Sequence, residues 1–256
     1  LGKEDDFSKK NIFVFGEPTL LTKIYNIIKF SFLLQPMQFG LFYSKQMKRF
    51  IEDNASNYEI IFFYHIRSSQ YLPNNYFGKT IIEMGDLYSR NYEQTFSYLN
   101  IFNPIKYIYL VESFLMKRIE KNIFSNFDKI ILFSKNEIKK IDKIFSKKII
   151  HIDITIDKIK KNYLFSKNNK TILFVGNLTY LPNILAVKSF IRNILPKLIL
   201  KIPGIKFEII GEINKFNKFF LSLNRNLKCW GKQKNLDQFV KRSFCGLANL
   251  DIATGV

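Results

Sequence analysis

The chain has 256 residues, of which 47% are hydrophobic, 24% charged and 16% aromatic. This composition excludes disordered, collagen-like and low-complexity proteins, and the length suits two domains that each bury a core. Lys and Arg number 40 against 21 Asp and Glu, which gives a formal net charge of +19. The arginines are few and scattered, whereas nucleic-acid-binding proteins concentrate Arg in a patch, so we predict no nucleic-acid partner. The charge leaves open a weak attraction to anionic membranes or glycans.

Two cysteines and one apolar stretch bear on localisation. Cys229 and Cys245 lie in strand-like apolar runs without a neighbouring His, which predicts two buried free thiols and a reducing cytoplasm. The most apolar stretch, residues 24–43, is interrupted by Lys29 and Pro36, so we predict no transmembrane helix. We therefore expect a cytoplasmic protein. Residues 24–42 suit either a core helix or an apolar surface that docks peripherally on the inner membrane face.

In chain order, short runs of β-branched and aromatic residues alternate with longer helical patterns, which is typical of βαβ units and a parallel sheet. The predicted strands span residues 11–15, 59–64, 79–84, 129–133, 149–154, 171–175, 206–210, 227–230 and 244–248. The predicted helices span residues 44–53, 104–124, 136–145, 185–201 and 236–243. Ser134 is expected to cap the third of these helices, with Glu137 as its capping-box partner.

A polar stretch rich in Lys and Asn, residues 158–170, predicts a linker between two α/β blocks. We expect an N-terminal Rossmann-like domain over residues 1–157, which lacks its first strand. We expect a partial C-terminal domain over residues 171–256, because it has too few elements to close a sheet. Both ends of the chain therefore look truncated.

The second block carries the sharpest motifs. It reads TILFVGNLTYLPN, then KFEIIGE, then KCWGKQKNL before a last apolar strand. This order of Gly- and Asn-marked turns closely resembles the C-terminal domain of glycosyltransferase family 4 enzymes of the GT-B fold. In the first block PMQ, IIFFYHIR, IIEMGDLYSRNYE and VESFLMKRIEKNIFSNFDKIILFSKNEI follow in order. They resemble the N-terminal domain of the exopolysaccharide and capsule branch of that family.

The resemblance implies an α/β fold of GT-B type, in which two Rossmann-like parallel-sheet domains face a cleft. It also implies a bacterial enzyme that moves a sugar from a UDP- or GDP-sugar to a surface polysaccharide or lipid-linked glycan, with retention of configuration. The substrate nucleotide sugar is then the only bound group, and no separate cofactor is expected. We predict no metal site, because the sequence has two His residues and no D-x-D motif.

The donor side of such a site is expected in the second block. Gly176 and Asn177 directly follow the strand at 171–175, and Tyr180 and Asn183 lie where the next helix begins. Backbone N–H groups and the helix dipole favour a diphosphate at such a turn. A purely structural turn with Asn183 as the helix N-cap fits these residues equally well.

Three further residues complete the donor assignment. The resemblance adds Gly211, Thr254 and Gly255 to the donor-binding set. Thr254 lies where the family has the first Glu of its donor motif, and the first turn lacks the family's usual Arg and Lys. The alternative is therefore a non-catalytic GT-B-like binding or scaffold protein, or an inactive fragment.

The acceptor side is expected in the first block. His65 and Arg67 follow the strand at 59–64, and Asp86 and Ser89 follow the strand at 79–84. His65 is the candidate catalytic residue, which contacts the transferred sugar or the acceptor, and Arg67 can bind an acidic sugar or a lipid diphosphate. The alternatives are a hydrogen-bonded histidine at a strand end and an ion pair between Arg67 and Asp86.

Three charged residues on the predicted helix at 104–124 are not expected to act in catalysis. Glu112, Arg118 and Glu120 are predicted to form a solvated, salt-bridged face of that helix.

Overall fold

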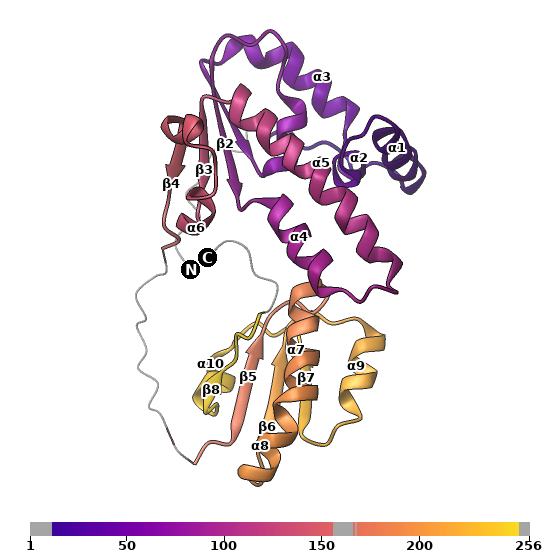
Figure 1. Cartoon of the computed structure of the whole chain (residues 1–256), viewed down its shortest axis with the longest axis vertical. Coiled ribbons are helices and arrows are strands. Elements are labelled where there is room, and N and C mark those ends of the chain that lie inside the picture. The colour runs from indigo at the N-terminus through magenta and orange to yellow at the C-terminus, as the bar shows by residue number, and fades with distance from the viewer. Residues whose placement is uncertain (1–11, 156–165, 167, 251–256) are drawn as a thin grey trace. The chain divides into compact units, whose positions relative to one another are not determined.

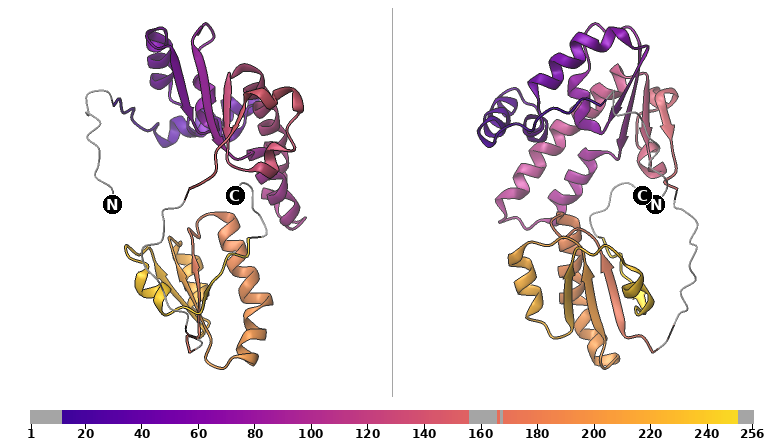
Figure 2. Two further views of the ribbon diagram at one scale, coloured as in Figure 1. Left: turned by 90° about the vertical axis from the view of Figure 1, so that its left-hand side faces the viewer. Right: turned by 180° about the vertical axis from the view of Figure 1, so that it is seen from behind.

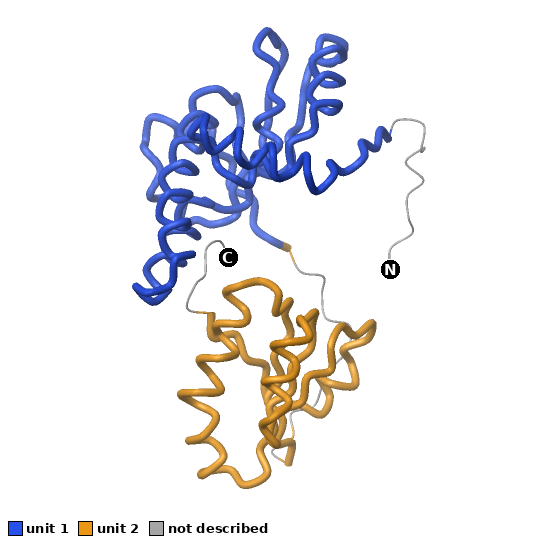
Figure 3. Tube along the Cα trace, turned by 90° about the vertical axis from the view of Figure 1, so that its right-hand side faces the viewer, with its two compact units in different colours: residues 1–154, 254–256 blue, residues 155–253 orange. Residues whose placement is uncertain are grey.

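The computed structural model describes residues 12–155, 166 and 168–250. They form two compact units, with the boundary between Ile154 and Thr155 (Figure 1 and Figure 3). The linker expected at 158–170 lies mostly outside the described residues. Among the described residues, no helix is both long and apolar enough to cross a membrane.

Unit 1 contains a four-stranded parallel sheet in the order β1-β2-β3-β4. Its strands are β1 (Ile60–Tyr64), β2 (Lys79–Gly85), β3 (Lys129–Leu132) and β4 (Ile149–His151). Ile60 pairs with Lys79 and Ile82 with Ile130, so the strands end at one shared carboxyl edge. The strand predicted at 11–15 is wrong for its described part, because Phe13 and Phe15 pack their rings against Phe50 instead of joining the sheet.

Helices cover one face of this sheet. They are α1 (Leu20–Phe32), α2 (Met37–Leu41), α3 (Lys45–Asn54), α4 (Tyr88–Tyr98), α5 (Pro104–Asn126) and α6 (Lys135–Ile138), with 3₁₀ segments η2 (Ala55–Asn57), η3 (Ile66–Tyr71) and η4 (Lys143–Lys148). The core forms where Phe63, Ile82 and Ile130 of the sheet meet Met116 and Ile123 of α5. On the other face of β1, alternate residues are exposed among the residues described.

The helix predicted at 136–145 is wrong, because α6 ends at Ile138 and the chain continues as η4 from Lys143. Ser134 does cap α6, since its hydroxyl accepts the N–H of Glu137 at 3.4 Å. The Glu137 carboxylate of the predicted capping box accepts the N–H of Leu87 at 2.8 Å.

Unit 2 contains a second four-stranded parallel sheet in the order β7-β6-β5-β8. Its elements are β5 (Thr171–Val175), α7 (Leu181–Asn193), α8 (Leu195–Lys201), β6 (Lys206–Ile210), α9 (Lys215–Ser222), β7 (Leu227–Gly231), α10 (Asp237–Lys241) and β8 (Cys245–Gly246). The order of strands reverses between β5 and β8. Such a switch point is where open α/β sheets bind ligands, at the carboxyl ends of the strands.

Both faces of this second sheet are covered (Figure 2). Phe174 and Phe207 pack on α7 and α8 through Val187 and Leu195, whereas Leu173 packs on the other face near α10. The single helix predicted at 185–201 is wrong. The structure has two helices there: α7 begins at Leu181, and the helical path is interrupted at Ile194 before α8. The interruption arises because a proline in the first turn of α8 has no N–H to continue the preceding helix.

The two cysteines differ from expectation. Both are free, but Cys245 is exposed and Cys229 is half-buried, so the prediction of two buried thiols is wrong. Cys245 lies in the short β8, which covers only two residues of the strand predicted at 244–248, and Cys229 lies in β7 at the edge of the sheet.

Candidate functional site

At the carboxyl edge of unit 2, the turn after β5 and the turn after β6 are in backbone contact. Gly211 has φ of 145°, and a Cβ there would lie 1.8 Å from the carbonyl oxygen of Gly176. The Gly176 N–H donates to the Ile210 carbonyl at 2.9 Å, and the Leu178 N–H donates to the Glu212 carbonyl at 2.7 Å. Glycine is therefore required at position 211, because any side chain would push the two turns apart.

The turn between β5 and α7 is braced by amide side chains. The Asn177 Oδ1 accepts the Thr179 N–H at 2.9 Å and the Thr179 hydroxyl at 2.7 Å. The Asn183 Nδ2 donates to the Asn177 carbonyl at 2.8 Å. Asn183 lies within α7 and is not its N-cap, which corrects that alternative. The N-cap is Tyr180, whose exposed side chain makes no capping hydrogen bond.

The positive end of α7 is thus left without a side-chain cap at the switch point of the sheet, where it can attract an anion. The turn itself carries no Lys or Arg, and Lys188 lies farther along α7 in an exposed position. Because the N–H groups of Gly176, Leu178 and Thr179 already donate within the protein, recognition of an anion here would rest mainly on the N-terminus of α7.

A residue that sequence reasoning missed lies on the other side of the switch point. Asn249 follows β8, and its Nδ2 donates to the Ala186 carbonyl at 3.0 Å. Its Oδ1 is buried and accepts no hydrogen bond within the part of the chain that is described. A polar residue just after an apolar strand was the available signal. Thr254 and Gly255 lie outside the described residues.

The carboxyl edge of unit 1 is built around His65. Its backbone has φ of 70° and ψ of 143°, a conformation that costs a non-glycine residue about 1–3 kcal/mol. The strain is held by hydrogen bonds: its N–H donates to the Glu83 carbonyl at 2.8 Å, and its carbonyl accepts the Ser68 hydroxyl at 2.7 Å. Such strain is typical of functional positions.

Both nitrogens of the His65 ring lie within hydrogen-bond distance of neighbouring side chains. Nδ1 accepts the Arg67 backbone N–H and the Arg67 Nε–H, both at 3.2 Å. Nε2 lies 2.6 Å from the Tyr88 hydroxyl and 3.1 Å from Arg67 Nη2. Burial, and then the positive charge of Arg67, lower the pKa of His65 to about 4. The His65 ring is thus uncharged at neutral pH.

Arg67 carries a charge that no neighbouring carboxylate neutralises. Its guanidinium lies 3.9 Å from the centroid of the Phe42 ring, and no carboxylate oxygen lies within 4 Å in the described part of the chain. The ion pair with Asp86 that was considered as an alternative is therefore not formed. Arg67 remains available to an anionic ligand.

Two carboxylates follow each other near the end of β2. Burial raises the pKa of Asp86, and burial followed by the charge of Asp86 raises the pKa of Glu83. Glu83 was missed from the sequence, although a charged residue inside an otherwise apolar strand was a visible signal. Raised pKa values are typical of groups that take part in proton transfer or ligand binding.

Ser89 has a different environment from the other three predicted residues. It is buried, and both its N–H (2.9 Å) and its hydroxyl (2.6 Å) donate to the carboxylate of Glu120. Together with the bond from Leu87 to Glu137, this closes the N-terminus of α4 with two buried glutamates. Burial raises the pKa of Glu120 to about 7.

The expectation of a solvated face on α5 is therefore wrong. Glu112 and Glu120 are both buried, and Glu112 accepts the Met37 N–H at 2.9 Å. Arg118 donates to the Leu34 carbonyl. These side chains connect α5 to α1, α2 and α4, because long side chains on one helix can satisfy the free N–H and C=O groups at the ends of others.

Neither a protein-family model nor a curated protein matches the sequence. The fold is similar to two solved structures. The crystal structure of TarM aligns with a TM-score of 0.52 and 13% identity over 77% of this chain and 38% of that chain. A mutant of S. aureus TarM in complex with fondaparinux, alpha-GlcNAc-glycerol and UDP aligns with a TM-score of 0.50 and 11% identity over the same shares.

The GT-B fold class is confirmed. Two parallel four-stranded sheets with helices match the arrangement in TarM, as the sequence motifs predicted. At these identities the likeness establishes the fold alone. The chain also spans only about two fifths of the length of the chains it matches.

Proposed function

We propose that this chain acts as a glycosyltransferase that moves a sugar from a UDP- or GDP-sugar to a surface polysaccharide or lipid-linked glycan. The carrying observation is the contact between Gly176 and Gly211 at the switch point of unit 2. It fixes the turn that leads from the end of a parallel strand into α7, in a fold similar to that of a TarM complex containing UDP.

Unit 2 takes the donor in this proposal. The diphosphate lies against the turn at Gly176 and Asn177, where the uncapped end of α7 offsets the charge that develops on the leaving group. Tyr180 and Asn183 border the same turn, and Gly211 keeps it in place. Thr254 and Gly255 belong to the same donor site. No separate cofactor or metal takes part.

Unit 1 takes the acceptor. His65, whose ring is uncharged, contacts a hydroxyl of the transferred sugar or of the acceptor. Arg67 binds an acidic sugar or a lipid diphosphate, and Asp86 binds a hydroxyl nearby. Ser89 is a positioning residue, because its hydroxyl holds α4 through Glu120.

A non-catalytic binding protein is the second candidate. It is favoured by the absence of Lys and Arg from the turn between β5 and α7, where a phosphate would otherwise meet a cation. The two candidates differ in turnover, since only an enzyme releases UDP or GDP in proportion to the acceptor supplied.

Peripheral association with an anionic membrane in the cytoplasm is part of the proposal. It is supported by the charge of +19 and by α1, whose exposed apolar residues include Leu20, Leu21, Ile28 and Phe32. Flotation with liposomes tests it: anionic vesicles should carry the protein up the gradient and neutral vesicles should not. Equal flotation, or none, would contradict it.

Calorimetric titration with UDP, GDP and their sugar conjugates tests the donor assignment. One nucleotide should bind with a Kd between micromolar and millimolar, and its sugar conjugate should be hydrolysed or transferred slowly. Replacement of Asn177 by Ala removes the bracing of the turn and should weaken this binding by about tenfold, whereas Asn193→Ala on the far end of α7 should not. No binding of any nucleotide at millimolar concentration would overturn the proposal.

A further inference from the structure

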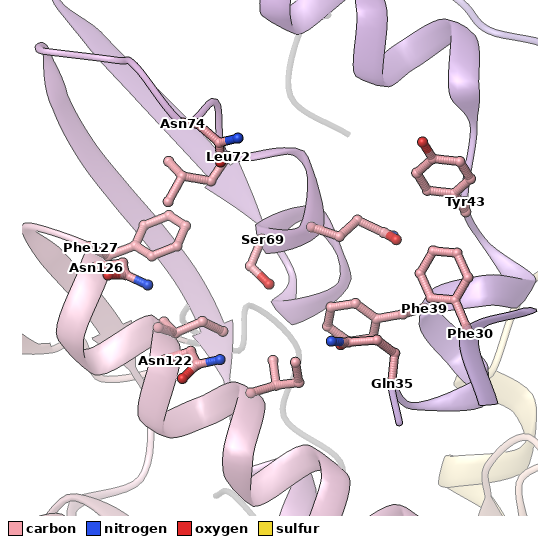
Figure 4. Close-up of a pocket in the computed structure, with 13 residues that line it drawn as sticks. Phe30, Gln35, Phe39, Tyr43, Ser69, Leu72, Asn74, Asn122, Asn126 and Phe127 are labelled. Carbon is pink, nitrogen blue, oxygen red and sulfur yellow. The ribbon is translucent and has the colours of Figure 1, made fainter. Parts of the chain in front are cut away.

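Unit 1 contains a pocket of about 510 Å³ that the proposed reaction does not use. It is lined by α1, the turn into α2, η3 with the loop that follows it, and the C-terminal half of α5. Figure 4 shows Asn122 and Asn126 on one side, Gln35, Phe39 and Tyr43 on the other, and Ser69 between them. Neither His65 nor Arg67 lines it. Its size suits one or two sugar rings.

Five amide side chains line this pocket: those of Gln35, Gln70, Asn74, Asn122 and Asn126. In the part of the chain that is described, none of them forms a hydrogen bond with another protein group. Some other amides of the same unit form hydrogen bonds within the protein.

For comparison, the Asn54 Nδ2 donates to the Phe50 carbonyl at 2.8 Å, and the Gln38 Nε2 donates to the Tyr92 hydroxyl at 3.1 Å. Five amides without a protein partner in the described part of the chain therefore line this one cavity.

The amide of Gln70 is the clearest sign that this pocket takes a polar ligand. Both atoms of its amide are buried from solvent, and neither has a hydrogen-bond partner. A buried amide without a partner costs about 1–3 kcal/mol. A ligand that offers a hydroxyl here would recover part of that cost, because an amide can both donate to a hydroxyl and accept from it.

The rest of the lining selects the class of ligand. The aromatic rings of Phe30, Phe39, Tyr43 and Phe127 supply apolar faces, and no charged side chain is among the lining residues described. Neutral walls do not repay the desolvation of a phosphate or carboxylate, which disfavours nucleotides and acidic sugars. A ligand with many hydroxyls, apolar C–H faces and no charge fits both features.

We propose that this pocket binds an uncharged sugar unit of the glycan acceptor, away from the reacting end. The inference rests on the proposed function for its biological meaning, but the pocket and the donor turn share no residue. Asn122 and Asn126 are one helical turn apart on α5, so their amides face the pocket together and can hold neighbouring hydroxyls.

Ligand-observed NMR and calorimetry on the whole chain test the proposal. The probes are glucose, galactose, mannose, N-acetylglucosamine and N-acetylgalactosamine, and the disaccharides cellobiose and lactose, all at millimolar concentration. We expect at least one to bind. Gln70→Leu and Asn122→Ala should each weaken that binding by about threefold to tenfold.

The matched controls are Gln46→Leu, on the exposed side of α3, and Ser125→Ala, on α5 outside the pocket. Both should bind as the unchanged chain does. Gln70→Leu should also keep or raise the Tm, because it removes an amide that has no partner. Binding that is equal in Gln70→Leu, Asn122→Ala and both controls would overturn the proposal, as would the absence of binding by every probe.

Parallel titration with UDP and GDP separates this inference from the proposed function. The pocket variants should leave nucleotide binding unchanged. Sugar binding without nucleotide binding would overturn the donor assignment and keep the pocket. Nucleotide binding without sugar binding would overturn the pocket alone.

Discussion

The carboxyl edges of the two sheets differ in the chemical groups that form them. In unit 1 the edge carries ionisable side chains, with His65 and Arg67 after β1 and Asp86 after β2. In unit 2 the edge is made of backbone, with Gly176 and Gly211 in contact. Steric fit therefore governs the edge of unit 2, while burial of charge governs that of unit 1. The consequence is that pH should act on unit 1 and side-chain volume on unit 2.

The largest expected effect is steric. Gly211→Ala would place a Cβ 1.8 Å from the Gly176 carbonyl oxygen at a φ of 145°, so we expect a loss of about 3 kcal/mol or more in the stability of unit 2. Denaturant unfolding followed by the fluorescence of Trp230 measures it. The control is Gly246→Ala, where nothing lies within 4 Å and the change should stay within about 1 kcal/mol. Equal stability of the two variants would break the steric half of the comparison.

The next effect is electrostatic. Glu120 has a pKa near 7 in the folded protein and near 4.5 when unfolded, so the folded state binds more protons between these values. Its contribution is therefore lost as pH rises through 7, by about 2 kcal/mol. The free energy of unfolding of Glu120→Gln, taken relative to that of the unchanged chain, should therefore be higher at pH 8 than at pH 5 by about 2 kcal/mol. Denaturant unfolding at both pH values measures this difference. The same stability difference between the two proteins at pH 5 and at pH 8 would contradict the prediction.

Unit 2 has one buried charge that sharpens the comparison. Glu208 in β6 is buried and accepts hydrogen bonds from Trp230 Nε1 at 2.8 Å and from Arg242 at 2.5 Å. Removing Arg242 leaves this carboxylate without its cation. We expect Arg242→Ala to cost about 1–2 kcal/mol, less than a fully buried pair because Arg242 is partly exposed. Arg225→Ala, which lacks such a carboxylate, is the control, and an equal loss in both would refute the assignment.

The smallest effect belongs to His65. Its pKa is lowered to about 4, so the folded state disfavours the charged ring, and the stability present above pH 6.5 is lost as pH falls towards 4. Because the ring is half-exposed, about 1 kcal/mol is at stake. His65→Gly, which removes the ring and accepts this backbone conformation, should remove this pH dependence. NMR titration of the imidazole measures the pKa directly, and a value above 6 would contradict the burial argument.

The sequence predicted correctly the elements whose residue pattern lies within a short stretch of the chain. The apolar runs at 171–175 and 206–210 became β5 and β6 with unchanged bounds, because buried parallel strands need both faces apolar. The predicted helices left out α4 and α9, whose aromatic and polar residues mix along the chain. The prediction of one helix at 136–145 was wrong because the apolar periodicity of the sequence continues past Ile138, where α6 ends.

The candidate site divides in the same way. Gly176 and Asn177 could be found because a turn after a strand is visible in a short window. The link between Ser89 and Glu120 spans 31 positions, and nothing near either residue reveals that their side chains meet in the interior. The burial of Glu120 is therefore visible only in the three-dimensional structure, whereas its position in the sequence predicted a surface residue.

The central claim is that a nucleotide diphosphate binds at the turn between β5 and α7 of unit 2, against the N-terminus of α7. Amide NMR of the whole chain, titrated with UDP and with GDP, tests it most directly. The account predicts that one nucleotide shifts the amide signals of Gly176, Asn177 and Gly211 in a saturable way. Shifts confined to other residues, or none with either nucleotide, would contradict it.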